Sequence, residues 1–201
     1  MDAIIERLSD FGISVMDSFF ISTGVVTLAE MGDKTQLLAF ILAARFKRPL
    51  PIIAGILVAT VINHGLAGAL GAWITQAIRP DVLRWLLAAS FIGMAIWTMI
   101  PDEIEEEETQ IAQRLGVFGA TLITFFLAEM GDKTQIATVA MAAHYGDPLL
   151  VVMGTTLGML LADVPAVYVG DKWADRVPMK LIHTVAAAIF VVLGIATLVV
   201  T

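Results

Sequence analysis

Long apolar stretches separated by short polar breaks run along the whole chain. Each stretch has the roughly 20 residues that a helix needs to cross a hydrocarbon core of about 30 Å. The breaks collect charged residues, Gly and Pro, and Pro is favourable in the first turn of a helix, where its missing N–H has no partner anyway. This pattern predicts an all-α integral membrane protein. We expect six transmembrane helices, over residues 17–44, 50–72, 82–100, 117–143, 149–170 and 181–200.

The composition agrees with this interpretation and excludes several classes of protein. Of the 201 residues, 58% are hydrophobic and 15% are charged, and the mean hydropathy is +0.86. A soluble domain has about 45–50% apolar and about 25% charged residues, so a soluble enzyme and a disordered regulator are excluded. The net charge of −7 lacks the basic footprint of a nucleic-acid binder. The absence of Cys removes disulfide scaffolds, thiolate metal sites and cysteine nucleophiles.

The positive charges outside the predicted helices set the expected orientation, because cytoplasmic loops carry an excess of Lys and Arg. Seven such residues gather on one side and three on the other: Arg45, Lys47, Arg48, Arg114, Lys172, Arg176 and Lys180 against Arg7, Arg79 and Arg84. We therefore expect both termini outside and the acidic linker 102–114 in the cytoplasm. That linker is interpreted as a solvated charge run, with a cation-gathering or regulatory role as the alternative.

The second half of the chain repeats the first at an offset of 99 residues. Residues 28–36 and 127–135 both read Leu-Ala-Glu-Met-Gly-Asp-Lys-Thr-Gln. We divide the chain into a first three-helix repeat, 1–101 with an N-terminal tail 1–16, and a second repeat, 115–201. Three helices is an odd number, so the second repeat enters the membrane from the opposite side. Such inverted repeats are typical of transporters, whose halves exchange roles to open one site to each side in turn.

Each copy of this motif places three charged residues near the middle of a predicted transmembrane helix: Glu30, Asp33 and Lys34, and then Glu129, Asp132 and Lys133. Six such residues facing lipid would cost on the order of 15–20 kcal/mol, so we expect them to face inward and toward one another. On a regular helix, positions i, i+3 and i+4 share a face. The Gly between the two acids allows a close backbone approach or a local break.

Four carboxylates and two ammonium groups sum to −2, the charge that one divalent cation neutralises. The donors are all oxygen, which suits Mg²⁺, Ca²⁺ and Mn²⁺. Without a cation, crowded carboxylates hold protons, because burial and like charge both disfavour the ionised form. The site is thus suited to cation/proton exchange, with accessory groups nearby: Lys34, Thr35, Gln36, Lys133, Thr134 and Gln135. The structural alternative is that Glu30–Lys34 and Glu129–Lys133 are ion pairs within one helix.

The doubled Glu-x-Gly-Asp-Lys/Arg-Thr/Ser motif, on the first and fourth predicted helices, resembles the Gdt-type cation/proton exchangers, including the bacterial manganese exporters. The resemblance implies a secondary transporter rather than an enzyme, with Glu30, Asp33, Glu129 and Asp132 as the cation-binding positions. It further implies export of Mn²⁺, with Ca²⁺ as the alternative, in exchange for H⁺, and no permanently bound cofactor. Because the chain is short and shows no leader, we expect a bacterial plasma membrane. Both a monomer and a homodimer stay open.

Some weaker features keep two interpretations each. Asp163, in the fifth predicted helix, is either a proton relay or accessory ligand, or a structural partner of His64 or of a lysine. Met31 and Met130, inside the motif, are interpreted as packing residues, with metal ligation as the alternative. A stripe of small residues is predicted to pack helices closely: Gly55, Ala59, Gly154, Gly158 and Ala162.

Two other functions compete with cation/proton exchange. A related exporter of another metal or of amino acids would use the same charges. An intramembrane aspartyl protease would use Asp33 and Asp132 as its dyad, but it needs neither the companion Glu and Lys residues nor an inverted repeat.

Overall fold

The computed structural model describes residues 2–99, 115–169 and 179–199, and all regular secondary structure in these ranges is α-helical, as predicted. The acidic linker 102–114 lies outside the described residues. Three described helices are long and apolar enough to cross a membrane: Pro49–Ala77, Pro80–Thr98 and Pro148–Tyr168. The helices are α1 (Asp2–Glu30), α2 (Lys34–Phe46), α3 (Pro49–Ala77), α4 (Pro80–Thr98), α5 (Gly116–Glu129), α6 (Lys133–Tyr145), α7 (Pro148–Val169) and α8 (Met179–Val199).

Two of the six expected transmembrane helices are broken in the middle. The stretch 17–44 divides into α1 and α2, and the stretch 117–143 divides into α5 and α6. Gly32 and Gly131 have φ angles of 82° and 80°, a left-handed conformation that ends a right-handed helix and that favours glycine. The local break that Gly32 allowed is therefore present, and the expectation that the motif residues share one face of a regular helix is wrong. Helix α1 also begins at Asp2, so residues 2–16 continue the first helix.

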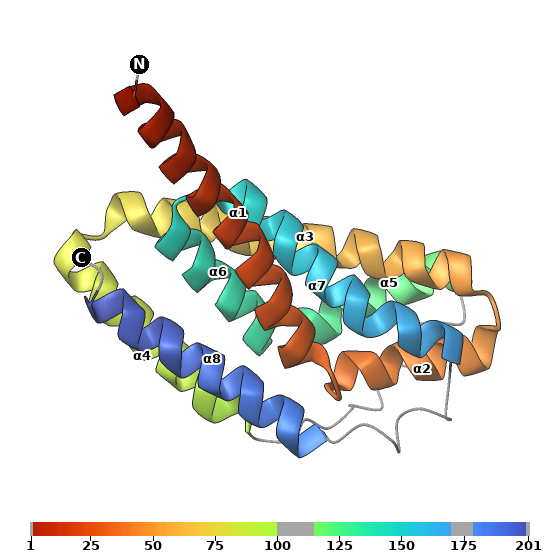
Figure 1. Cartoon of the computed structure of the whole chain (residues 1–201). Helices are drawn as coiled ribbons and strands as arrows, with labels where there is room; N and C mark the ends of the chain where they lie inside the picture. The colour runs from red at the N-terminus through yellow and green to blue at the C-terminus, as the bar shows by residue number, and fades with distance from the viewer. Residues whose placement is uncertain (1, 100–114, 170–178, 200–201) are drawn as a thin grey trace.

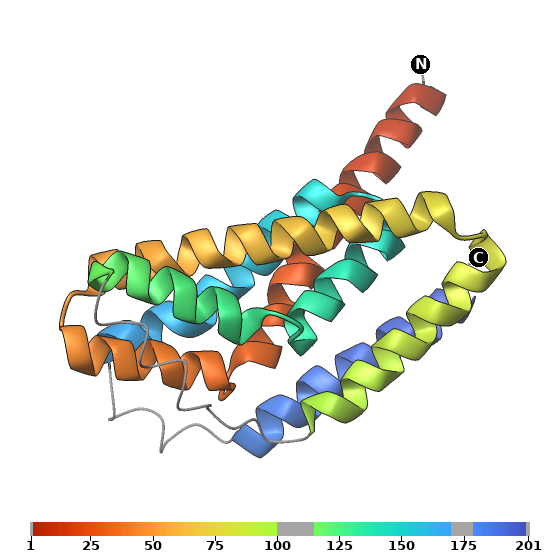
Figure 2. The ribbon, with the colours of Figure 1, turned by 180° about the vertical axis from the view of Figure 1, so that it is seen from behind.

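Each half of the chain packs mainly against the other half. Helix α1 packs along α7, and α5, its counterpart in the second half, packs along α3, the counterpart of α7. Helices α4 and α8 lie side by side along one edge of the bundle (Figure 1), and the view from behind shows the same pair (Figure 2). The pairing of equivalent helices is thus reciprocal between the two halves.

Glycines on α3 and α7 allow these close contacts. A Cβ added at Gly158 would lie 2.7 Å from the carbonyl oxygen of Thr23 on α1, and one at Gly154 would lie 2.5 Å from that of Phe19. On the other side of the bundle, a Cβ at Gly55 would lie 2.7 Å from the Cβ of Thr121 on α5. The predicted packing role of these glycines is confirmed.

Replacing Gly158 with alanine is expected to destabilise the protein, because the new methyl group forces α7 away from the backbone of α1. Overpacking of this kind costs about 1–3 kcal/mol, which unfolding of the detergent-solubilised protein would measure. The matched control is Gly93→Ala on α4, where a Cβ meets nothing within 4 Å. An equal loss of stability in both variants would contradict the close-packing role.

Candidate metal centre

The two helix breaks place the motif acids at helix ends. In the first copy, Glu30 is the last residue of α1, and Asp33 is the N-cap of α2, where its side chain accepts a hydrogen bond from the N–H of Lys34 at 2.7 Å. In the second copy, Glu129 ends α5 and Asp132 is the N-cap of α6. Broken helices of this kind bring partial charges and open backbone groups to ion sites inside membrane proteins.

The Thr and Gln residues of the motif hold each break in place. Thr35 Oγ1 donates to Glu30 Oε2 at 2.6 Å, and the N–H of Gly32 donates to Gln36 Oε1 at 2.8 Å. The second copy makes the same two bonds, Thr134 to Glu129 at 3.0 Å and Gly131 to Gln135 at 2.7 Å. These bonds give a physical reason for the identity of the Thr and Gln in the two copies: the Thr orients a carboxylate, and the Gln closes the break.

The motif lysines pair across the two halves of the chain. Lys34 Nζ lies 3.8 Å from Asp132 Oδ1, and Lys133 Nζ lies 3.4 Å from Asp33 Oδ2. These distances favour pairing across the two copies over the alternative that each lysine pairs with the glutamate of its own copy. The cause is the helix break, which removes the i,i+4 geometry that such a pair needs. The two pairs differ in burial: the Lys133 side chain is 1% exposed and that of Lys34 is 22% exposed.

The four predicted carboxylates are all buried, with Asp132, at 3%, the most exposed. Three carboxylate oxygens, one each from Glu30, Asp33 and Asp132, lie within 4.8 Å of one another. Glu129 lies outside this three-residue cluster but within electrostatic range of Asp33 and Asp132. The structure therefore brings three of the four predicted ligands into one cluster and places the fourth beside it.

Each glutamate keeps one oxygen open for a further ligand. The motif threonines hold one oxygen of Glu30 and one of Glu129, whereas Glu30 Oε1 and Glu129 Oε1 are buried without a hydrogen-bond partner. Divalent cations such as Ca²⁺ bind oxygens at about 2.3–2.6 Å, so oxygens up to 4.8 Å apart can share one ion. The burial, charge and spacing of the Glu30, Asp33 and Asp132 oxygens all fit a dehydrated divalent cation.

Asp163 is the fifth buried acid near this centre. It is fully buried on α7, lies within electrostatic range of Glu30 and Glu129, and has no hydrogen-bond partner on either oxygen among the described residues. His64 is equally buried and has no partner on either ring nitrogen. The structural interpretation of Asp163, as a partner of His64 or of a lysine, is therefore wrong in the described part of the chain.

A hydrogen bond also links the first copy of the motif to α7. Gln36 Nε2 donates to the carbonyl oxygen of Ala162 at 2.9 Å, which ties α2 to α7 one residue before Asp163. Sequence reasoning missed this contact, because nothing in the pattern marks a backbone carbonyl as an acceptor.

The Met130 side chain is 55% exposed, so its thioether is not enclosed with the carboxylates, and its interpretation as a metal ligand loses support.

Comparisons with known proteins identify the family. A family model described as "Divalent cation/proton antiporter GDT1" matches residues 18–106 and 117–201. A Vibrio cholerae protein named "Putative manganese exporter" is 50% identical over 184 residues, which cover 91% of each chain. "GDT1-like protein 5" of Arabidopsis thaliana is 25% identical over 222 residues, 92% of this chain and 96% of that protein. No solved structure matches. The chain belongs to the GDT1 family of divalent cation/proton antiporters, which are transporters rather than enzymes.

Proposed function

We propose that this protein exports Mn²⁺ from the cytoplasm of a bacterium in exchange for protons, at the buried carboxylates of the two motif copies. The observation that carries the proposal is the three-residue cluster of Glu30, Asp33 and Asp132 oxygens within 4.8 Å of one another. These donors are hard oxygens, which suit Mn²⁺ and Ca²⁺ better than thiolate- or imidazole-seeking metals. The name of the Vibrio cholerae relative supports Mn²⁺ as the exported ion.

The ion pairs suggest how charge is balanced during exchange. Each motif aspartate lies against a lysine of the other copy, so the two pairs are neutral as units. Glu30 and Glu129 then carry the net charge of −2 of the motif residues. One divalent cation or two protons neutralise them, and alternation between these two states is the exchange. Asp163, with both oxygens open beside the glutamates, is the accessory group in this proposal.

Alternating access through an inverted repeat completes the proposal. In it, α1–α2 and α5–α6 each cross the membrane as a broken helix, α3, α4, α7 and α8 cross singly, and both termini lie outside. The reciprocal packing of α1 on α7 and of α5 on α3 supports a two-fold relation between the halves. The crossed lysine pairs support it too, since each half supplies the countercharge of the other.

Proton flux in sealed proteoliposomes tests this function. With a pH-sensitive dye inside, addition of Mn²⁺ outside is expected to drive protons out of vesicles that contain the protein. Ca²⁺ is the second ion of the panel, and Mg²⁺ and Zn²⁺ complete it. The expected order is Mn²⁺ at or above Ca²⁺, with Zn²⁺ weakest because the proposed ligands among the described residues are all carboxylate oxygens. If neither Mn²⁺ nor Ca²⁺ moves protons, the proposal is wrong.

Thr35→Val is expected to weaken cation binding, because it removes the hydrogen bond that orients Glu30. Loss of a group that orients a metal ligand typically costs about 10–100-fold in metal affinity, and the half-saturating Mn²⁺ concentration in the flux assay would report it. Thr35→Ser is the matched control, since it keeps the hydroxyl. Equal half-saturation in the Val and Ser variants would show that the hydroxyl does not position Glu30.

A further inference from the structure

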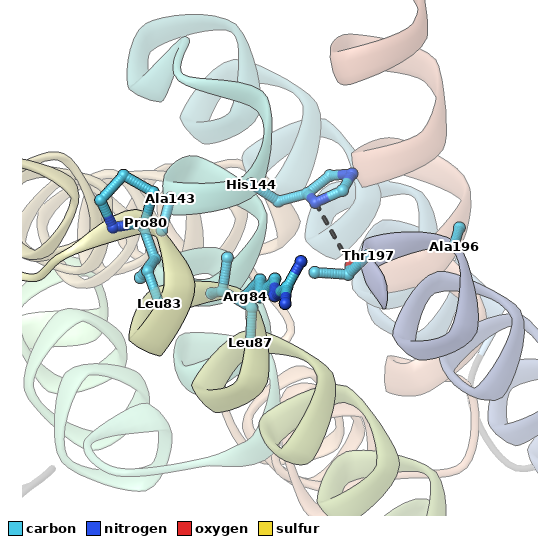
Figure 3. Close-up of a pocket in the computed structure, with 8 residues that line it drawn as sticks. All are labelled: Pro80, Leu83, Arg84, Leu87, Ala143, His144, Ala196 and Thr197. Carbon is cyan, nitrogen blue, oxygen red and sulfur yellow. Dashed lines mark hydrogen bonds between the residues drawn. The ribbon is translucent and has the colours of Figure 1, made fainter. Parts of the chain in front are cut away.

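A mostly apolar cavity lies away from the carboxylates, where α4 begins and α6 and α8 end. Its volume is about 410 Å³, and its lining includes Leu83, Arg84 and Leu87 of α4, Ala143 and His144 of α6, and Thr197 of α8 (Figure 3). These positions lie within the first two turns of α4 and near the last turns of α6 and α8. The cavity therefore lies close to one face of the membrane.

Arg84 is the single charged residue of the lining, and the described residues do not neutralise it. Its Nε is buried and has no hydrogen-bond partner, and the guanidinium has no ion-pair partner among the described residues. The Arg84 Cζ atom lies 6.0 Å from the ring centroid of the neighbouring Trp85. Figure 3 shows the guanidinium reaching toward His144 and Thr197, across the cavity.

A neighbouring arginine shows the contrast. Arg79 lies just before α4, pairs with Asp81 at 3.5 Å and has a side chain that is 82% exposed. Water and a carboxylate thus satisfy Arg79, whereas part of the Arg84 guanidinium is removed from water with no anion beside it. A buried donor of this kind costs free energy unless a partner satisfies it.

Two other polar atoms of the lining, Thr197 Oγ1 and His144 Nδ1, have hydrogen-bond partners. Thr197 Oγ1 donates to the carbonyl oxygen of Leu193 at 2.8 Å and also lies within hydrogen-bond distance of His144 Nδ1, at 3.3 Å. This bond joins α6 to α8. The remaining lining is apolar, and on the outside of α4 the side chains of Trp85 and Leu86 are 60% and 50% exposed.

We propose that this cavity binds the headgroup phosphate of an anionic phospholipid. The forked guanidinium matches two phosphate oxygens, and a basic side chain at the membrane interface attracts the negative headgroup of an anionic lipid. The apolar lining suits the glycerol and the first methylenes of a lipid, and an exposed Trp near a helix start is typical of the membrane interface. Free inorganic phosphate, in contrast, is strongly hydrated, and its transfer into a mostly apolar cavity would cost free energy of desolvation.

Native mass spectrometry of the whole protein in detergent, titrated with phosphatidylglycerol, tests this proposal. The wild type and the control Arg79→Gln are expected to retain one tightly bound phosphatidylglycerol. Arg84→Gln is expected to bind this lipid at least about tenfold more weakly, because it loses a charged hydrogen bond. Phosphatidylcholine, which has the same phosphodiester but no net charge, should bind more weakly to the wild type. Inorganic phosphate is the competitor that represents a free anion.

A second variant keeps the test valid if Arg84→Gln does not fold. Ala196→Leu fills the cavity from α8 and leaves Arg84 in place, and it is expected to lose the bound phosphatidylglycerol as well. Unchanged binding of phosphatidylglycerol in both variants would overturn the proposal. Equal binding of phosphatidylcholine would overturn it too, as would displacement of the lipid by millimolar inorganic phosphate.

Discussion

Glu30→Gln is expected to abolish cation-driven proton flux. Glutamine keeps the shape of the side chain and an oxygen that can accept the hydrogen bond from Thr35. It removes one of the two charges that the lysines leave uncompensated. Two unit charges about 4 Å apart interact by about 4 kcal/mol at an effective dielectric constant near 20. A divalent cation doubles this interaction, so the loss of one carboxylate charge is expected to cost at least roughly a thousandfold in affinity.

The two motif copies provide a matched comparison for this variant. Glu129→Gln should abolish flux as well, because Glu129 occupies the equivalent helix end and makes the equivalent bond with Thr134. Asp81→Asn, with a side chain 75% exposed and remote from the site, is the control that should leave flux unchanged. Flux at the wild-type rate in Glu30→Gln would show that the carboxylate does not carry the exchange.

Lys133→Met is expected to have the largest effect on folding. This variant removes the ammonium group whose Nζ lies 3.4 Å from Oδ2 of the fully buried Asp33 side chain. Breaking a buried ion pair by removing one partner costs about 3–5 kcal/mol, because a charge is left without compensation. Unfolding of the detergent-solubilised protein, followed by thermal or denaturant titration, would measure this loss in the free energy of unfolding.

The equivalent variant of the first copy should be milder. The Lys34 side chain is 22% exposed and its pair with Asp132 is longer, at 3.8 Å, so water already screens this pair and its loss costs less, although the Asp132 side chain itself is only 2% exposed. The double variant Lys133→Met with Asp33→Asn should recover much of the lost stability, since it removes both charges, but not the transport. Equal destabilisation by Lys133→Met and Lys34→Met would contradict the difference in burial.

The membrane class, the family and the burial of the four motif acids could be predicted from the sequence because they depend on local patterns. A run of apolar residues predicts a helix wherever it packs, and a charged motif inside such a run must avoid lipid. The nine identical residues in 28–36 and 127–135 also made the two copies evident. Family membership and the burial of Glu30, Asp33, Glu129 and Asp132 confirm this part of the analysis.

The lysine partners could not be predicted, because they depend on how the chain leaves the helix at Gly32 and Gly131. A regular helix places Lys34 over Glu30, and only the left-handed φ at Gly32 turns it toward Asp132. The contact of Gln36 with the Ala162 carbonyl has the same origin, since it joins residues 126 positions apart. Periodicity carries no information at such distances.

The crossed lysine pairs also constrain how the protein can be made. Translation delivers Asp33 about a hundred residues before Lys133, its countercharge. Until the second half arrives, a ribosome-bound first half holds an acid that lipid disfavours. That acid must stay protonated, near water or shielded by the insertion machinery. We therefore expect the first half, α1–α4, to complete its packing only after the second half has been synthesised.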